Sequence, residues 1–418
     1  MGKALFMSTD PAEKAFSSFP SIIALTPIVA AVLTSFLVIG LAMPVIPLHV
    51  HDGLGLSTFH VGLVSGAQFG ASFLFRFRAG RHADAYGARH AMMLGLALSA
   101  FSGVLYHVSL LPSDSPLLSM GFLLAGRGVL GAGESFIVTA ALVWGIARAG
   151  ERHTGMVMSW VGTAMYIAYA GGAPLGAMLF GAFGFGAMAT ATTVLPLLAL
   201  VFVLPLAPTP SMTAARPCYA KVIRAVWLPG IGLALSSVGF GAVTTFVVVL
   251  FARNGWDRAW LAFSLLSVFF MFGRICFGHL PDRVGGARVA LIFIVIEAAG
   301  QACIWLAPSS FMALAGAALT GLGYSLVYPG LGLAAARAAP PHQRGIVMGA
   351  YTAFLDLALG IAGPALGLVA AFSTVDLVYG ASTLAVLCSV IVACILSRRP
   401  QGHDPQPEAT AADSCEVS

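Results

Sequence analysis

The chain has 418 residues, of which 59% are hydrophobic and only 9% are charged, and its mean hydropathy is +0.92. Because about a quarter of the residues of a soluble domain are charged, this composition excludes an ordinary soluble protein and predicts one that lies in a lipid bilayer. The net charge of +5 does not indicate a nucleic-acid partner, since the basic residues are scattered among loops and form no continuous face.

Twelve stretches are long and apolar enough to cross a bilayer, which takes roughly 20 residues per helix. In chain order they are residues 24–48, 58–78, 90–110, 117–146, 155–183, 187–206, 226–251, 259–279, 288–307, 311–335, 346–372 and 377–396. A proline-containing break separates six from six. We therefore expect an all-α membrane protein of 12 transmembrane helices in two six-helix bundles, 22–206 and 226–397, with an N-terminal segment 1–21, a linker 207–225 and a tail 398–418.

The basic residues predict how the chain is oriented, because Lys and Arg collect in short cytoplasmic loops. The loops on the other side contain only Arg253 and Arg258. The richer side carries Lys3, Lys14, Arg81, Arg89, Arg148, Arg152, Arg216, Lys221, Arg224, Arg283, Arg288, Arg337, Arg344, Arg398 and Arg399. Both termini are thus expected to be cytoplasmic.

The chain is one unit written twice. Gly80-Arg-His-Ala-Asp84-Ala-Tyr-Gly87 recurs 198 residues later as Gly278-His-Leu-Pro-Asp282-Arg-Val-Gly285, and each copy follows a lone arginine, Arg76 or Arg274. Further along, Gly155 with Pro174 recurs 190 residues later as Gly345 with Pro364. The drop from 198 to 190 means that the first half carries about eight extra residues, which we assign to the stretch 111–119.

Each repeated motif joins two predicted helices. Gly87 and Gly285 are expected to supply a backbone conformation with positive φ. Asp84 and Asp282 lie at a helix edge, where a carboxylate accepts backbone N–H groups or pairs with an arginine; they either hold the two halves together in one state or only cap the turn. The remaining motif residues are Gly80, Arg89, Gly278, Arg283 and Arg288. Arg76 and Arg274 are kept in both copies, which favours a scaffold or gating role for them too.

Two halves of six helices, with Gly-x-x-x-Asp-x-x-Gly between helices 2 and 3 and again between helices 8 and 9, resemble the major facilitator superfamily of secondary transporters. The resemblance covers residues 22–397 and extends to the YhhS/YfcJ-type branch of bacterial inner-membrane transporters. It includes Arg127 in helix 4, followed by Gly131 and Gly133, and the helix 5 sequence 171–176. It implies a multi-pass inner-membrane protein that works by alternating access, with the cytoplasmic gate closed by the loop motifs.

One departure from the family pattern concerns that gate. Ala85 and Ala88 stand where the family usually has basic residues, whereas the second copy keeps Arg283 and Arg288. We therefore predict that the second copy holds the cytoplasmic gate more firmly than the first.

Helices 5 and 11 are rich in small residues, which let helix backbones approach closely in lipid, and proline loosens the helical hydrogen-bond ladder. In the family the helix 5 version is associated with exporters. Simple tight packing explains the glycines equally well, so both interpretations stay open. The residues are Gly171, Gly172, Pro174 and Gly176 in helix 5 and Gly363, Pro364 and Gly367 in helix 11.

Four charged residues fall inside apolar stretches, where each costs on the order of 3 kcal/mol and is usually functional. They are Arg127 and Glu134 in helix 4, Glu297 in helix 9 and Asp356 in helix 11. All four are absent from the other copy of the repeat, which has Ala317, Tyr324, Ser99 and Tyr166 at the corresponding positions. We hypothesise that Arg127 orients substrate or couples to a proton, and that Glu134 and Asp356 lead as proton carriers.

Alternatives remain for several of these residues. Arg127 could form a fixed ion pair with a carboxylate, and Glu297 could lie near the membrane interface. Tyr166 and Tyr324 either line the substrate cavity, together with the four charges, or face lipid. The sequence His49-Val-His51-Asp52 lacks a further ligand for a metal and is expected to form an ordinary turn.

The function expected is secondary active transport, in the form of a proton-coupled exporter (an antiporter) of small organic molecules such as a drug, sugar or metabolite. A proton-coupled importer is the alternative. No phosphate-binding loop or hydrolase motif occurs, which disfavours a primary pump and a membrane enzyme. A non-transporting sensor is the other rival class. We expect a monomer in the bilayer whose partners are protons and a small substrate, with the proton gradient as energy source, no metal and no other cofactor.

Overall fold

A computed structural model describes residues 19–112, 114–150, 153–208, 219–337 and 344–398, and these residues are almost entirely helical. The first half consists of α2 (Phe19–Leu48), which continues into the π-helical turn η1 (His49–Gly53), α3 (Thr58–Tyr86), α4 (Ala88–Val108), α5 (Pro116–Ala149), α6 (Thr154–Phe183) and α7 (Phe185–Val203). The second half consists of α8 (Tyr219–Arg253), α9 (Trp260–Phe277), α10 (Leu280–Val284), α11 (Gly286–Trp305), α12 (Ser310–Tyr324), α13 (Val327–Arg337), α14 (Arg344–Phe372) and α15 (Val375–Arg398).

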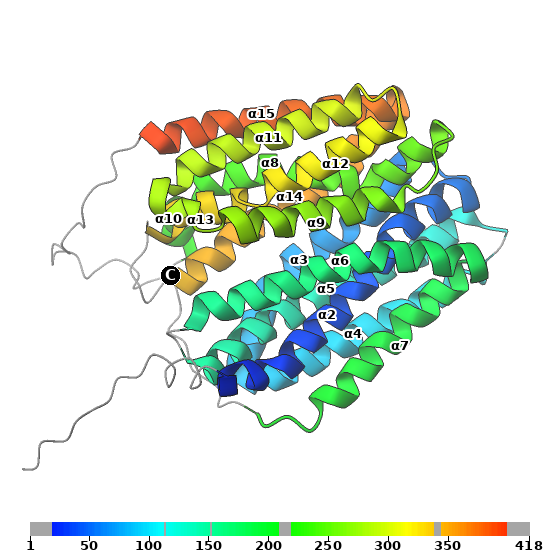
Figure 1. The fold of residues 1–418 in the computed structure, drawn as a ribbon. Coiled ribbons are helices and arrows are strands. Elements are labelled where there is room, and N and C mark those ends of the chain that lie inside the picture. Colours follow the sequence, from blue (N-terminus) through cyan, green and yellow to red (C-terminus); the bar gives the residue numbers. More distant parts are fainter. Residues whose placement is uncertain (1–18, 113, 151–152, 209–218, 338–343, 399–418) are drawn as a thin grey trace, which may run out of the picture.

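The two halves lie side by side, with their long helices running roughly in the same direction (Figure 1). The start of α2 and the end of α15 lie at one end of the molecule. We call the opposite end, which carries η1 and the connections from α8 to α9 and from α14 to α15, the η1 end. The halves meet mainly where α3 packs on α14, α6 on α9 and α2 on α8.

Eleven stretches of the described residues are long and apolar enough to cross a membrane, with α12 and α13 counted as one stretch, Ser310–Arg337. The predicted run 58–78 lies in α3, which is not among the eleven although it has 29 residues. Gln68 and Ser72 of α3 are fully buried, so protein surrounds the polar side of this helix. Composition therefore supports eleven spans, and twelve stays a prediction.

The repeat motifs form tight helix junctions. As expected, Gly87 and Gly285 have positive φ values of 86° and 103°, which residues with a side chain rarely adopt. The first motif is not a loop, because α3 continues to Tyr86 and α4 begins at Ala88. The extra residues of the first half lie where the sequence placed them: the connection 109–115 is longer than its counterpart 306–309, and α5 extends farther before Gly131 than α12 does before Gly321.

A break divides the tenth apolar run into α12 and α13. Pro329 lies in the first turn of α13 and has no N–H group to donate to the carbonyl of Ser325, four residues earlier. Arg274 of α9 donates from Nε to this carbonyl at 3.4 Å. Arg274 therefore satisfies a backbone group that would otherwise be left without a partner inside the membrane.

Candidate functional site

An ion pair joins the two halves in the middle of the molecule. Arg76 on α3 contacts Oδ2 of Asp356 on α14 through both Nε and Nη2, each at 2.5 Å. The side chains are 15% and 3% exposed, so the pair is almost fully removed from solvent. The sequence singled out both residues but assigned them to different roles, Arg76 to the gate and Asp356 to proton carriage. The structure brings them into one interaction.

Glycines let α3 and α14 meet backbone to backbone between this ion pair and the η1 end. A Cβ on Gly62 would overlap the carbonyl of Gly363, and a Cβ on Gly66 would come within 2.7 Å of the carbonyl oxygen of Gly360. Nearer the η1 end, the Thr58 hydroxyl donates to the Gly367 carbonyl at 3.1 Å. We call this line of contacts, from Thr58 to Arg76, the α3–α14 seam.

The pseudo-symmetric seam between α6 and α9 is built from side chains. Tyr166 stacks on Phe270 with ring centroids 3.5 Å apart, and Ser264 donates to the Ala170 carbonyl at 2.8 Å. The repeat places Tyr166 opposite Asp356 and Arg274 opposite Arg76. The second seam has a phenol where the first has a carboxylate, so among the described residues of the two seams the ion pair is confined to α3 and α14.

Glu134 and Arg127 on α5 are both buried, and they do not pair with each other in the described structure. Gln68 of α3 donates from Nε2 to Glu134 Oε2 at 2.7 Å. One turn along α3 and one residue along α5, Ser72 and Ser135 are joined by further hydrogen bonds. These contacts fix Glu134 against α3, the helix that also carries Arg76, so the two carboxylates proposed as proton carriers reach the same helix from opposite halves.

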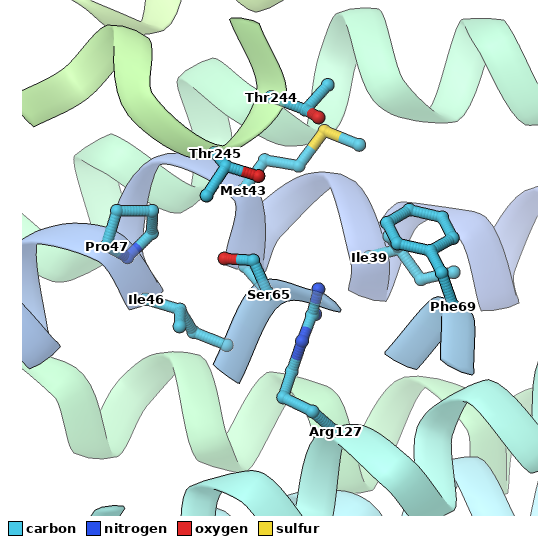
Figure 2. A pocket seen from close by; sticks show the side chains of 10 residues that line it. Ile39, Met43, Ile46, Pro47, Ser65, Phe69, Arg127, Thr244 and Thr245 are labelled. Carbon is cyan, nitrogen blue, oxygen red and sulfur yellow. The ribbon is translucent and has the colours of Figure 1, made fainter. Parts of the chain in front are cut away.

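Arg127 points into a cavity of about 20 Å³ between the halves (Figure 2). Ser65 of α3 and Thr244 and Thr245 of α8 contribute hydroxyls to its lining, and Phe69 with apolar residues of α2 completes it. Nε and Nη1 of Arg127 are buried and have no hydrogen-bond partner in the described structure. A cavity of this size holds about one water molecule. The arrangement suits a guanidinium whose partner enters from the cavity.

Glu297 lies elsewhere. Its side chain is fully buried in the middle of α11, where Ser236 of α8 donates to Oε2. α11 packs on α8, α12, α13 and α15, all in the second half. The structure therefore places Glu297 inside the second half, on a helix that takes no part in the three main contacts between the halves. It does not lie at the end of that helix, as a near-interface position would require.

The two predicted aromatic residues, Tyr166 and Tyr324, lie in or next to the α6–α9 seam, where both rings contact Phe270. Tyr324 of α12 is 4% exposed and stacks on Phe240 of α8 at 5.4 Å between centroids. Its hydroxyl and that of Ser237 share a hydrogen bond of 2.9 Å. Tyr166 is half-buried in the α6–α9 seam. The lipid-facing interpretation of these two rings is therefore not supported.

At the η1 end, His49 stacks on Phe185 at 3.9 Å between ring centroids.

The helix 5 glycines serve packing inside the first half. A Cβ on Gly172 would come within 2.8 Å of the Cα of Gly40 on α2, and a Cβ on Gly176 would overlap the backbone of Leu41. Gly171 has open space around it. The related glycines of α14 instead face α3 of the other half. One repeated pattern thus serves two different helix contacts.

The loop motifs do not latch the halves together in this conformation. Asp84 is half-buried, Asp282, Arg283 and Arg288 are exposed, and no ion pair involving them is formed among the described residues. Arg89 donates to the carbonyl of Leu204 at the end of α7, within its own half.

The comparisons agree with this architecture. The sequence matches the family model described as Major Facilitator Superfamily over residues 28–295 and 230–414. The chain belongs to this family. An uncharacterized MFS-type transporter of Salmonella typhimurium is 39% identical over 371 residues, which cover 88% of this chain and 94% of that protein. The uncharacterized MFS-type transporter YhhS of Escherichia coli is 37% identical over 378 residues, 90% and 93% of the two chains.

Solved structures of the family have the same fold. The nucleoside transporter NupG superimposes with a TM-score of 0.73 at 12% identity, covering 89% of this chain and 99% of that one. A D-xylose-proton symporter gives 0.70 at 15% identity, with 88% and 97% covered. The protein is therefore an MFS-type transporter, a multi-pass protein of the bacterial inner membrane.

Proposed function

We propose that this transporter works by alternating access and couples the movement of a small organic molecule to protons, with export as the direction. The observation that supports the proposal is the buried ion pair between Arg76 and Asp356, which joins the two halves across the α3–α14 seam. Alternating access requires this contact to break in every cycle, because the halves rock about a site between them.

Protonation of Asp356 is the step that would let the seam open. A buried ion pair holds together through charge, and removing one of the two charges leaves the other without compensation. A proton on Asp356 abolishes its attraction to Arg76 and so removes the advantage of the closed seam. Deprotonation restores the pair and closes the seam again. The second seam, with Tyr166 and Phe270 in place of the ion pair, does not respond to protons in this way.

The direction in which the site faces follows from the seams and from the predicted orientation. The contacts of the α3–α14 seam lie between the middle of the molecule and the η1 end. Termini in the cytoplasm put the η1 end on the outer side of the membrane. In our proposal, this conformation is therefore closed to the outside, with Asp356 deprotonated and the cavity at Arg127 reached from the cytoplasm. That is the state in which an exporter takes up substrate after it has released its proton to the cytoplasm. For antiport, substrate binding must then open the seam in place of the proton, because a seam that opened only on protonation would carry protons outward together with substrate.

Glu134 and Arg127 form the second part of the proposed site. Glu134 contacts α3 through Gln68, so its protonation state bears on the helix that carries Arg76. Arg127 lines a cavity between the halves, and its Nε and Nη1 have no hydrogen-bond partner among the described residues. In a low-dielectric cavity such a guanidinium gains most from a polar or charged substrate group. We assign Arg127 to substrate orientation and Glu134 to proton carriage beside Asp356.

The export direction is carried over from the resemblance to the YhhS/YfcJ-type branch, some of whose members are described as sugar or drug exporters. The glycines of α6 give it no further support, because their packing on α2 accounts for them. Proton-coupled import is the alternative, and the direction of flux distinguishes it from export.

Reconstitution into proteoliposomes tests the proposal. With an imposed pH gradient, a panel of radiolabelled sugars, amphipathic drugs and zwitterionic metabolites is screened for gradient-driven flux, and the sign of the flux gives the direction. Asp356→Asn and Glu134→Gln should lose gradient-driven flux. Asp376→Asn is the matched control, because Asp376 pairs with Arg253 within the second half and both side chains are partly exposed. Wild-type coupling in both test variants would refute the proposal.

A further inference from the structure

Glu297 is a carboxyl group enclosed in the second half without a positive partner. Its side chain has no exposed surface. Ser236 donates to Oε2, and Oε1 is buried with no hydrogen-bond partner. The backbones of α8 and α12 enclose it closely, since a Cβ on Gly239 would come within 2.8 Å of Oε1 and one on Gly323 would overlap the backbone of Glu297.

A network of hydrogen-bonded polar groups lies next to this carboxyl. One turn along α11, Gln301 donates from Nε2 to the Gly239 carbonyl at 3.1 Å and to the Thr320 hydroxyl at 3.0 Å. Ser382 of α15 donates to Gln301 Oε1 at 2.5 Å. Four helices, α8, α11, α12 and α15, thus bring hydroxyl, amide and carbonyl oxygens to one level of the second half.

No basic side chain faces Glu297 among the residues that the structure describes. α8 faces it with Ser236, and α15 meets the site with Ser382 and Val386. The titratable groups close enough to act on it are the phenols of Tyr324 on α12 and of Tyr166 on α6. An isolated carboxylate is too costly to keep in such a place. A single positive charge must therefore accompany it.

We propose that Glu297 is the centre of a binding site for a monovalent cation, a proton or a sodium ion, held in the core of the second half and separate from the cavity at Arg127. The site goes beyond the proposed transport function, because cation binding can be measured on protein that moves no substrate. The Ser236 hydroxyl and the neighbouring hydroxyl, amide and carbonyl oxygens suit either cation. A proton would sit on the carboxyl itself, and a sodium ion would be held by the carboxylate and its oxygen neighbours.

The site lies where it can act on the substrate cavity through α8. Ser236 and Gly239 of α8 contact the Glu297 site, and Thr244 and Thr245, farther along the same helix, line the cavity at Arg127. Between them, Phe240 stacks on Tyr324. Loss of the cation would leave a bare charge beside α8 and favour a displacement of that helix.

Cation binding to the purified full-length protein in detergent tests the proposal. Binding of radioactive sodium and apparent thermal stability are measured across pH, with sodium compared to potassium at equal ionic strength. Glu297→Gln is the first variant, because glutamine has the shape of the protonated acid and needs no cation. A sodium-specific stabilisation that Glu297→Gln loses identifies sodium. Stability that falls as pH rises in the wild type, without a sodium effect, and stays level in Glu297→Gln identifies a proton.

A pair of serine variants keeps the test decisive if Glu297→Gln does not fold. Ser236→Ala removes the hydroxyl that contacts Glu297. Ser389→Ala is its control, because it removes a buried hydroxyl that links α15 to the Gly232 carbonyl of α8 without touching Glu297. The cation or pH response should weaken in Ser236→Ala and stay at the wild-type level in Ser389→Ala. If the sodium and pH responses of Glu297→Gln equal those of the wild type, the proposal is overturned. Where Glu297→Gln does not fold, equal responses in Ser236→Ala and the wild type overturn it.

Discussion

Replacing Asp356 by asparagine should open the α3–α14 seam. The change keeps the size of the side chain and removes its charge, so Arg76, whose side chain is only 15% exposed, is left buried without its partner. Breaking a buried ion pair in this way costs about 3 to 5 kcal/mol. Because Arg76 is not completely enclosed, we take about 3 kcal/mol, the lower end. That corresponds to a shift of about 150-fold in the equilibrium between the closed and open seam.

The distance between the halves at the η1 end reports this equilibrium. Spin labels at Leu111→Cys in the first half and Phe372→Cys in the second sit on side chains that are 77% and 88% exposed. The labels are introduced after the six native cysteines have been changed to serine. Double electron–electron resonance then gives the distance distribution between the labels, and from it the populations of the closed and open seam. An open state that holds about 1% of the wild-type molecules would rise to about 60% in Asp356→Asn, by the same 150-fold factor.

The control for this measurement is Asp376→Asn. Asp376 and Arg253 are 2.6 Å apart but 38% and 47% exposed, and both lie in the second half. An exposed pair contributes less than about 1 kcal/mol and does not span the seam, so the distance distribution should stay as in the wild type. A distribution for Asp356→Asn that equals those of the control and the wild type would show that the ion pair does not hold the seam closed.

Three further predictions follow from the contacts. Gly62→Ala should also shift the spin-label distances towards the open seam, because the added Cβ would overlap the α14 backbone. Gly70→Ala on the same helix is the control, since its Cβ would meet free space and should leave the distances unchanged. Equal distances in the two variants would contradict the backbone contact. Glu134→Gln should abolish pH-gradient-driven flux but retain substrate exchange without a gradient, and retained coupling would remove Glu134 from the proton path. Gly176→Ala should lower the apparent melting temperature, through a clash worth about 1 to 3 kcal/mol, while Gly171→Ala should leave it unchanged.

Sequence alone determined much of the architecture. Composition required a membrane protein, and the repeated motif divided the chain into halves before any contact was known. The positive φ values at Gly87 and Gly285 followed from the motif, because a one-residue junction between helices is a local property of the backbone. The four charges inside apolar stretches were also visible, since their cost depends on the surrounding stretch and not on the partner.

Only the tertiary structure decided what those residues contact. The repeat relates α3 and α14 to α9 and α6, but it cannot reveal that the first pair carries an arginine with an aspartate and the second an arginine beside stacked rings. It also could not place Glu297 in the core of the second half, or show that the glycines of α6 pack on α2 whereas those of α14 pack on α3. Helical periodicity tells which side chains share a face. Which helix covers that face depends on how all the helices pack together. The packing therefore decides whether a buried charge meets an opposite charge, as Asp356 does, lines a cavity, as Arg127 does, or has no charged partner, as with Glu297.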